Sequence, residues 1–484
     1  MNILDYKELN LKCGLEIHRQ LDTKHKLFCG CPTTMLEKDQ FSMIKRKQHP
    51  VASELGEVDI SAQYEFLRDR EFNYQIFKNE DCLVECDEEP IRPLNKEALE
   101  IVIKIALLFN CTIPEEIQVM RKTVIDGSNT SAFQRTMIVG LNGFLEYMGR
   151  KIDIMHVSLE EDAAGIVEEE DGKITYKLNR LGVPLIEIGT GLLTDFSPKE
   201  VQDIAYMLGM ICRSTGKVKR GIGTVRQDLN ISIKNGERVE IKGLQELNLM
   251  SKIIELEVQR QLSLPKVIKE TRSLNPDGTT RFTRPLPGAA RMYPETDTPP
   301  VSIDEKMMNR IKKDLPELWT KKYARFKEKL GLSDELVKEM LDSEYLDLFE
   351  RLIKKYKVSP SVVANLFTNT LKDLKKRENV LVENLSDNDF EELVDLLSKG
   401  KIVKESIPEI IKCKLNRPDS KISDSIKKLG LEAIDVSELK KIVKEIIEKN
   451  KGAPEGKIIG IVMSKVRGRV KSDIVVKIVK EQLK

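Results

Sequence analysis

The sequence predicts an α+β protein in which a mostly antiparallel sheet domain precedes helical domains, and three observations indicate this. Up to about residue 302, short apolar runs alternate with turn residues, which is typical of strands. Beyond residue 302, apolar residues recur at the spacing of a helix face and β-branched alternation almost disappears. The chain has 484 residues, more than one hydrophobic core usually holds. We therefore expect domains at residues 1–302, 303–400 and 401–484.

The first domain is expected to hold strands separated by turns and covered by a few helices. The expected strands are residues 11–21, 84–87, 117–123, 136–141, 144–147, 151–159, 174–178, 185–188, 225–233 and 239–241. Asn235-Gly236, between the last two, is a signal for a hairpin. The expected helices are residues 96–109, 197–215 and 247–261. The second of these helices has Ser197-Pro198 at its start and Glu200 behind them, which predicts a capped N-terminus.

The remainder of the chain is expected to be helical. The expected segments are residues 304–332, 333–357, 359–375, 387–399, 436–449, 456–466 and 472–483. Lys399-Gly400-Lys401 is a break in the helical pattern, and it marks the expected start of the last domain.

Composition indicates a soluble, cytoplasmic protein. One third of the residues are charged, and no apolar run approaches the roughly 20 residues that span a bilayer. The start of the chain lacks the basic and then apolar pattern of an export signal. The eight cysteines form no paired framework, so we expect reduced thiols.

The net charge of +2 hides an asymmetry along the chain. Residues 401–484 contain 21 Lys and Arg against 12 Asp and Glu, a net charge of +9, whereas residues 1–400 contain 59 against 66, a net charge of −7. A basic tail on an acidic body indicates contact with a polyanion such as a nucleic acid. The alternative is a composition rich in lysine throughout, as in residues 321–327 (KKYARFK).

Acidic residues interrupt apolar strands at three places: Glu16-Ile17-His18, Glu160-Glu161-Asp162, and Glu187 within PLIEI. Because strand side chains alternate, Glu16 and His18 share one face, whereas Glu160 and Glu161 cannot both face the same ion. Carboxylates with one imidazole suit a hard divalent cation such as Mg²⁺ or Mn²⁺. One such island alone is more often solvated or salt-bridged. Three in one region are costly to bury unless a cation compensates their charge.

Further polar patterns indicate a cleft. Arg226, Asp228 and Asn230 alternate along one predicted strand face, which suits a polar cleft, and a solvent-facing edge is the alternative. Glycine-bearing loops at residues 126–131, 220–226 and 285–291 could contact phosphate. None of them is a Walker A or a GxGxxG motif, so no standard nucleotide-binding fold is indicated.

The cysteines and histidines give weaker signals. Cys29 and Cys31 could supply half of a zinc site, and Cys82 and Cys86 are candidates for the other half. Reduced or buried cysteines are commoner, so we do not expect zinc. With four histidines and no GxSxG motif, nothing indicates a hydrolase triad, and we interpret His156 as structural.

Seven ordered blocks carry a resemblance to a known family. They are residues 14–24 (GLEIHRQLDTK), 27–32 (LFCGCP), 126–136 (DGSNTSAFQRT), 159–164 (LEEDAA), 179–188 (NRLGVPLIEI), 240–244 (EIKGL) and 290–297 (ARMYPETD). Together they resemble the B/E family of tRNA-dependent amidotransferases, and within it the archaeal E type. The resemblance covers nearly the whole chain, since residues 452–463 (GAPEGKIIGIVM) are similar to the YqeY-like tail domain of that family.

One departure from the E type concerns an inserted domain. E-type proteins usually carry a domain similar to the insertion of bacterial-type aspartyl-tRNA synthetases, placed after the segment that matches residues 258–262. Here residues 263–268 leave no room for it. Either this lineage has lost the module or the chain stands between the E and B types. The chain also lacks the downstream CxxC of many B-type proteins, which weakens the case for zinc.

The resemblance implies an enzyme that converts Glu-tRNA(Gln) into Gln-tRNA(Gln). ATP would phosphorylate the γ-carboxylate, and ammonia would then displace phosphate, with Mg²⁺ neutralising the phosphate charge. The implied metal ligands are His18, Glu160 or Glu161, and Glu187, with Glu16 in support. The implied contacts to nucleotide or substrate are Arg226, Asp228, Asn230 and Lys242.

The resemblance also implies partners. Releasing ammonia from an amide needs an activated Ser, Thr or Cys, and no such motif is present in the sequence. In the family a separate asparaginase-like glutaminase, of the D type, does this work. Ammonia would reach the site through a polar passage, for which residues 128–131 are a candidate. Residues 1–302 would be the catalytic cradle, and the basic tail would bind tRNA(Gln). The alternatives are a non-catalytic tRNA-binding or assembly subunit, and a B-type subunit that also acts on Asp-tRNA(Asn).

Overall fold

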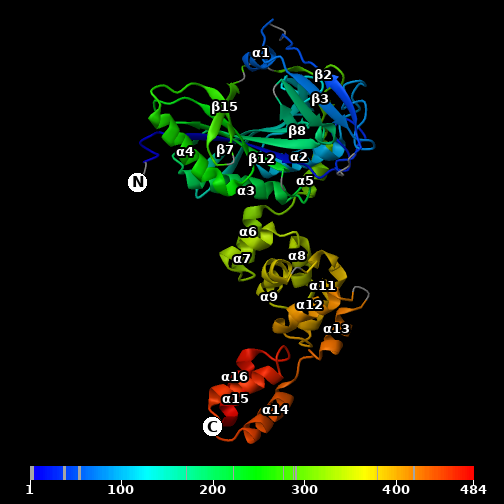
Figure 1. The fold of residues 1–484 in the computed structure, drawn as a ribbon, viewed down its shortest axis with the longest axis vertical. Helices are drawn as coiled ribbons and strands as arrows, with labels where there is room; N and C mark the ends of the chain where they lie inside the picture. Colours follow the sequence, from blue (N-terminus) through cyan, green and yellow to red (C-terminus); the bar gives the residue numbers. More distant parts are fainter. Residues whose placement is uncertain are drawn as a thin grey trace. The chain divides into compact units, whose positions relative to one another are not determined.

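The chain forms two compact units, Met1–Trp319 and Thr320–Lys484, in a computed structural model (Figure 1). The structure describes all residues except 1–4, 36–39, 53–55, 171, 222, 276, 287, 289–291, 379, 418–419 and 484. A large sheet dominates the first unit and helices make up the second, so the predicted α+β class is confirmed.

An eleven-stranded sheet is the frame of the first unit. Its order is β15-β14-β13-β12-β1-β10-β7-β6-β5-β16, with β11 paired to β1. The strands are β1 (Lys12–Gln20), β5 (Met120–Thr123), β6 (Phe133–Tyr147), β7 (Arg150–Glu161), β10 (Pro184–Thr190), β11 (Leu193–Thr194), β12 (Val225–Ser232), β13 (Val239–Leu244), β14 (Glu270–Leu274), β15 (Thr280–Pro285) and β16 (Met292–Pro294). Neighbours run antiparallel except β13 and β14, which α4 (Met250–Ser263) connects as a parallel pair.

Two smaller sheets complete this unit. One has the order β2-β3-β9-β8, and the other pairs β17 with β4. Their strands are β2 (Ser42–Arg46), β3 (Glu71–Ile76), β9 (Lys173–Lys177), β8 (Gly165–Glu170), β4 (Glu116–Ile117) and β17 (Val301–Ser302). The four-stranded sheet has an apolar core of its own, which includes Phe72, Tyr74 and Tyr176. The short helix α1 (Ile60–Leu67) contacts β15 through Tyr64 and Phe282.

Helices cover one face of the large sheet. In Figure 1, α2 (Lys96–Leu108), α3 (Pro198–Arg213) and α4 lie along the same side of it. Helix α2 contacts β6 and β7, α3 contacts β1, and α4 contacts β12. The apolar residues of the three helices and of the strands form one core. The predicted cap of α3 is confirmed, because Ser197 and Glu200 exchange both hydrogen bonds of a capping box. The hairpin at Asn235-Gly236 is confirmed as well, with Asn235 at a φ of 67°.

Residues 303–319 pack with the first unit. In α5 (Glu305–Lys313), Ile311 is buried in the main core, and Trp319 contacts Tyr206 edge to face. The three-domain division of the sequence remains a prediction.

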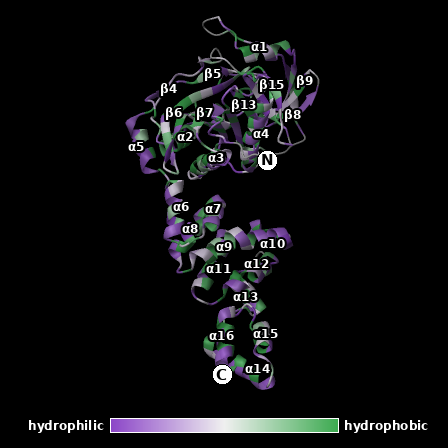
Figure 2. Cartoon of the chain, turned by 90° about the vertical axis from the view of Figure 1, so that its left-hand side faces the viewer, coloured by the Kyte–Doolittle hydropathy of each residue, from purple (hydrophilic) through white to green (hydrophobic). Residues whose placement is uncertain are grey.

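The second unit consists of helices in which hydrophilic and hydrophobic residues are interspersed (Figure 2). They are α6 (Trp319–Glu328), α7 (Asp334–Asp342), α8 (Leu346–Lys355), α9 (Pro360–Asn365), α10 (Leu371–Glu378), α11 (Asp387–Ser398), α12 (Ile407–Leu415), α13 (Ile422–Leu429), α14 (Val436–Lys449), α15 (Glu455–Lys465) and α16 (Ser472–Leu483). The last three share an apolar core of their own, which includes Leu439, Val462 and Val475. No helix in the described part of the chain is long and apolar enough to cross a membrane.

The structure corrects some of the predicted elements. Residues 84–87 form turns instead of a strand, and residues 136–141 and 144–147 belong to the single strand β6. The strands β2, β3, β8, β11 and β14–β17 were not predicted from the sequence. In β8, Glu168–Glu170 are exposed, so this strand has no apolar alternation by which the sequence could reveal it.

Candidate active site

A polar cleft lies on the face of the large sheet opposite its helices. Leu15 and Ile17 of β1 are buried in the core beneath the helices, so Glu16 and His18 point to the other face. The cleft has a volume of about 780 Å³. Its lining includes polar residues from β5, β6, β10, β1, β12 and β13, with Ile166 of β8 and Tyr176 of β9 on one wall.

One group of metal-ligating side chains is formed by His18, Glu160 and Glu187. Strand register brings them together, because His18 pairs with Glu187 across β1 and β10, and β10 pairs with β7. One ligand atom from each of the three lies within 4.8 Å of the others. His18 Nε2 is 3.1 Å from Glu187 Oε2.

Cationic groups surround these two carboxylates. Lys122 Nζ on β5 is 2.8 Å from Glu160 Oε1 and 3.4 Å from Glu187 Oε2, and His156 Nε2 is 2.8 Å from Glu187 Oε1. Burial favours protonation of Glu187, but Lys122, His156 and His18 together hold its pKa well below the ordinary value. Burial opposes the charged form of His18, yet Glu187 raises the pKa of this imidazole above its usual value. Glu187 is therefore anionic at neutral pH and available as a ligand.

Gly189 makes room for His156. These residues pair across β10 and β7, and a Cβ atom on Gly189 would lie 2.3 Å from the imidazole ring of His156. Any larger residue at position 189 would therefore displace the ring from Glu187.

A second group lies beside the first on β1 and consists of Glu16, Asp228 and Glu240. Their ligand atoms also lie within 4.8 Å of one another. Lys242 Nζ is 2.6 Å from Asp228 Oδ2 and 3.0 Å from Glu240 Oε1, and Asn230 donates to Glu16 at 3.4 Å. Burial raises the pKa of Glu16, although Lys242 opposes this shift. For Asp228 and Glu240, burial is the largest influence and favours protonation, but Lys242 together with the other cations and hydrogen bonds around them lowers the pKa of both carboxyl groups.

Both groups have the donors that a hard divalent cation prefers. The first offers one imidazole nitrogen and carboxylate oxygens, and the second offers carboxylate oxygens alone. The three carboxylates of the second group share the ammonium of Lys242, so a cation would relieve their mutual repulsion. The residues present therefore fit Mg²⁺ at either group.

The acidic island at residues 160–162 divides among three environments. Glu160 belongs to the first group, whereas Glu161 lies on the opposite face of β7 and accepts a hydrogen bond from the Arg135 backbone N–H at 3.1 Å. Asp162 pairs with Arg226 at 2.8 Å and with Arg180 at 3.5 Å. Of the two alternatives, Glu160 or Glu161, only Glu160 lies in the first group, because strand alternation turns Glu161 away from the cleft.

The other predicted residues line the cleft or support it. Glu16 belongs to the second group and not to that of His18. Arg226, Asp228 and Lys242 line the cleft, and Asn230 holds Glu16.

Lys122 and Glu240 were not predicted as site residues, and His156 was interpreted as structural although it contacts Glu187. His156 is four residues before Glu160 in β7, and Glu240 is two residues before Lys242 in β13. Because strand side chains alternate, each pair shares a face of its strand, and this alternation could have identified His156 and Glu240. Lys122 gave no such signal.

Comparison with known proteins identifies the class to which this fold and site belong, the tRNA-dependent amidotransferases. Residues 11–309 match the GatB/GatE catalytic domain, and residues 347–483 match the GatB domain. The chain belongs to the GatB/GatE family.

Three archaeal relatives are each named as the E subunit of glutamyl-tRNA(Gln) amidotransferase. The chain is 35% identical to that of Methanocaldococcus jannaschii and 34% identical to that of Methanococcus maripaludis, over 99% of both chains in each case. It is 36% identical to that of Saccharolobus solfataricus over 100% of this chain and 99% of the relative. The alignment with the Methanocaldococcus jannaschii protein has 629 positions, whereas this chain has 484 residues. At least 145 residues of that relative therefore have no counterpart in this chain. In this chain α4 ends at Ser263 and β14 begins at Glu270, which confirms that no domain is inserted between them.

Proposed function

We propose that this chain is the kinase and transamidase subunit that makes Gln-tRNA(Gln) from Glu-tRNA(Gln). The observation that carries the proposal is the pair of ligand groups, which start two residues apart on β1 and whose members, except the buried Glu160 beneath them, line one cleft of the catalytic domain. Two neighbouring cation sites suit a triphosphate and the carboxylate that attacks it. The names of the three relatives agree with this substrate.

The proposed reaction has two steps. An oxygen of the glutamyl γ-carboxylate attacks the γ-phosphorus of ATP, the bond to ADP breaks, and an acyl phosphate forms. Ammonia then attacks the acyl carbon, phosphate leaves with the C–O bond electrons, and nitrogen loses a proton. Mg²⁺, when bound, would neutralise phosphate charge in the first step. It would be held by His18, Glu160 and Glu187 in one group, and by Glu16, Asp228 and Glu240 in the other.

The remaining polar residues of the cleft would position the substrates. Arg226 and Lys242 line the cleft with partly exposed side chains, and Asp162 and Asp228 bind their terminal cationic groups. This arrangement fixes two cations where phosphate oxygens would lie, so we assign them to the nucleotide or the tRNA terminus. Asn230 acts through Glu16 and has a positioning role.

Ammonia would come from a glutaminase partner, an asparaginase-like protein of the D type. The loop at residues 128–131 supports the proposed passage, since Ser128 and Asn129 line the cleft while Asn129, Thr130 and Ser131 line a second cavity. That cavity has a volume of about 10 Å³. This is close to the least that holds one water molecule, a molecule about as large as ammonia. Its other walls include Lys26, Glu85, Arg135 and Glu161.

The basic residues at 401–484 would bind the tRNA backbone in the cytoplasm. This part has a net charge of +9, and a protein that neutralises several phosphates loses affinity steeply as salt increases. The direct link between α4 and β14 means that tRNA selection here does not use a domain at that point.

The decisive experiment omits the partner. The pure chain is incubated with Glu-tRNA(Gln), ATP, Mg²⁺ and ammonium chloride, and the aminoacyl ester is analysed for glutamine. We expect ATP-dependent formation of Gln-tRNA(Gln), and a folded chain that forms none is a non-catalytic binding subunit. Asp-tRNA(Asn) in a parallel reaction tests the B-type alternative, which predicts asparagine on that tRNA.

A further inference from the structure

The cleft contains a carboxylate that belongs to neither ligand group. Five of the described acidic residues line the cleft, and four of them, Glu16, Glu187, Asp228 and Glu240, are members of the two groups. The fifth is Asp126, which follows β5 and whose side chain is 28% exposed. The metal and phosphate chemistry proposed above gives this anion no role. Asp126 is therefore the candidate for contact with another part of the substrate.

Asp126 lies where the two arms of the large sheet approach each other. Arg284 is on β15, at one edge of the sheet, and β5 is next to the other edge. Even so, Arg284 Nη1 is 3.4 Å from Asp126 Oδ2, because the sheet curves around the cleft. The Ser128 N–H donates to Asp126 Oδ1 at 3.0 Å. The carboxylate is thus oriented by contacts from both arms.

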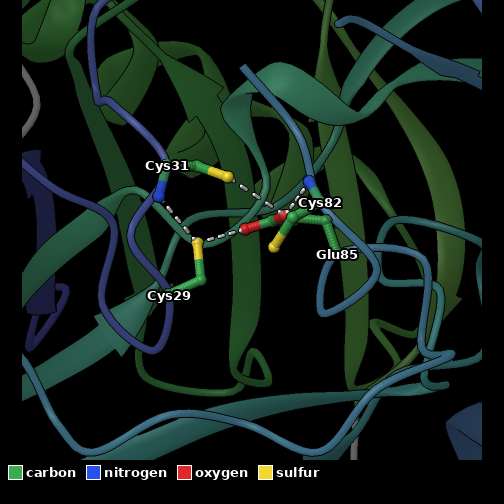
Figure 3. Close-up of side chains that lie close together, drawn as sticks. All are labelled: Cys29, Cys31, Cys82 and Glu85. Atoms are coloured by element: carbon green, nitrogen blue, oxygen red, sulfur yellow. Dashed lines mark hydrogen bonds between the residues drawn. The ribbon is translucent and has the colours of Figure 1, made fainter. Parts of the chain in front are cut away.

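The loop that carries Asp126 is anchored to neighbouring segments. Tyr176 of β9 donates to the Asp126 carbonyl at 2.8 Å, and Thr130 of the same loop donates to the Glu85 carbonyl at 2.7 Å. Figure 3 shows that the Glu85 carboxylate is held in turn by Cys29 Sγ, which donates to it at 2.7 Å. These contacts fix the position of Asp126 relative to the ligand groups before any substrate binds.

The glutamyl end of the proposed substrate carries two groups that can be charged. Phosphorylation places its γ-carboxylate at the cation groups. Its α-amino group is not acylated and takes up a proton near neutral pH, more readily when a carboxylate lies beside it. Arg226 and Lys242 in the same cleft would repel this ammonium, so its binding requires an anion outside the two ligand groups.

The distance from the first ligand group to Asp126 suits a glutamyl residue. Lys122, which contacts Glu160 and Glu187, precedes Asp126 by four residues and lines the same cleft. Four residues span at most roughly 13 Å of chain. A glutamyl residue with a Mg²⁺–oxygen bond at its γ-carboxylate and a hydrogen bond at its α-nitrogen spans about 10 Å. The difference is within the reach of the Asp126 side chain.

We propose that Asp126 binds the α-ammonium group of the glutamyl ester and thereby selects glutamyl over aspartyl substrates. The inference rests on the proposed function, because it needs the γ-carboxylate at the ligand groups. An aspartyl ester is one methylene shorter, about 1.3 Å, so it cannot reach the cations and Asp126 in the same pose. A displacement of about 1 Å at the reacting centre costs a factor of about 100 in rate. The contact would therefore account for action on Glu-tRNA(Gln) rather than on Asp-tRNA(Asn).

Removal of the charge from either partner tests this contact. The full chain is assayed with ammonium chloride on Glu-tRNA(Gln) and on the same tRNA esterified with the α-hydroxy analogue of glutamate, in which a hydroxyl replaces the amino group. The wild-type chain should lose about 10- to 100-fold in kcat/KM on the analogue, as for a lost hydrogen bond between charged groups. Asp126→Asn keeps an oxygen for the Ser128 N–H, and it should distinguish the two substrates by less than about threefold.

Asp153→Asn is the matched control. Asp153 is on β7 with its side chain 60% exposed, and it pairs with Lys151 at 2.8 Å, away from the residues that line the cleft. This variant should discriminate against the analogue as strongly as the wild-type chain. Equal discrimination by the wild-type chain and a folded Asp126→Asn variant overturns the proposal.

Asp126→Glu tests the selection by length. Its carboxylate reaches about 1.3 Å further into the cleft. The ratio of kcat/KM for Asp-tRNA(Asn) to that for Glu-tRNA(Gln) should therefore increase by at least about 10-fold. An unchanged ratio in the folded variant contradicts the selection by Asp126.

Failure of the proposed function would give a different result. A wild-type chain that forms no Gln-tRNA(Gln) rejects the transamidase, whatever Asp126 does. In that case, filter binding of the same two esterified tRNAs to the wild-type chain and to Asp126→Asn repeats the comparison with affinities. The wild-type chain should prefer the glutamyl ester and the variant should not, and equal preferences again overturn the contact.

Discussion

Two neighbouring glutamates offer a sharp test of the site, because the same substitution should have opposite effects at each. Glu160 and Glu161 are consecutive residues of β7, and both are buried. Replacement by glutamine keeps the size of the side chain and removes its charge. Strand alternation predicts that Glu160→Gln damages the cleft, whereas Glu161→Gln damages the packing on the other face.

The contacts of Glu160 predict a loss of activity with little loss of stability. Its carboxylate accepts from the Thr136 hydroxyl at Oε1 (2.7 Å) and from the Gln134 amide at Oε2 (3.1 Å), so the single oxygen of a glutamine keeps the first bond and loses the second. Lys122 keeps its ion pair with Glu187, in which Nζ lies 3.4 Å from Oε2. We expect the free energy of unfolding to fall by only about 1 kcal/mol. With one of two carboxylates of the first group gone, the affinity for Mg²⁺ should fall by at least about 100-fold.

The contacts of Glu161 predict the reverse. Glu161→Gln removes the charged acceptor of the Arg135 N–H and the ion pair with its guanidinium at 3.5 Å. Arg135 keeps its ion pair with Glu295, in which Nε lies 2.6 Å from Oε2, so the buried guanidinium stays paired. The expected cost is about 1–3 kcal/mol, as for one hydrogen bond to a charged group. The Mg²⁺ dependence of the reaction should not change.

The assay measures ADP release in the presence of Glu-tRNA(Gln) and ammonium chloride as Mg²⁺ is titrated. Urea unfolding of the same samples gives the stability of each variant. A Glu161→Gln variant that remains folded and needs as much additional Mg²⁺ as Glu160→Gln would refute the assignment of faces on β7.

Three further predictions concern the cleft, the tail and acid stability. The double variant His18→Ala with Glu187→Ala should lose Mg²⁺-dependent phosphorylation and keep tRNA affinity in a filter-binding assay, and a parallel loss of both would indicate unfolding instead. A chain without residues 401–484 should bind tRNA more weakly and with a shallower dependence on salt, so an unchanged slope would place the tRNA contacts elsewhere. Burial opposes the charge of Glu295, but hydrogen bonds from Arg121 and Arg135 lower its pKa to about 2. A carboxyl group whose pKa is lowered by folding stabilises the folded state above its unfolded pKa of about 4.3. That stabilisation disappears as pH falls toward 2. The advantage of the wild-type protein over Glu295→Gln in urea unfolding should therefore be full at pH 6 and shrink below about pH 4.3, and an advantage that is constant down to pH 3 would contradict the role of this carboxylate.

The sequence by itself determined the elements with strong periodicity. The helices at residues 436–449, 456–466 and 472–483 lie within one residue of α14, α15 and α16, because apolar residues at helical spacing are a local signal. It also determined that Glu16 and His18 share a face of β1, since alternation is a property of any strand.

Only the tertiary structure decided which residues meet across the sheet. Register between β1, β10 and β7 places His18 with Glu187 and Glu160, and the pairing of β1 with β12 places Glu16 with Asp228. Local sequence carries no information on register between distant strands, so the choice between Glu160 and Glu161 and the division into two ligand groups stayed open until the strands were paired. For the same reason, the turn that brings Glu85 to Cys29 and Cys31 was invisible in a pattern of cysteines. Its position depends on contacts between segments more than fifty residues apart.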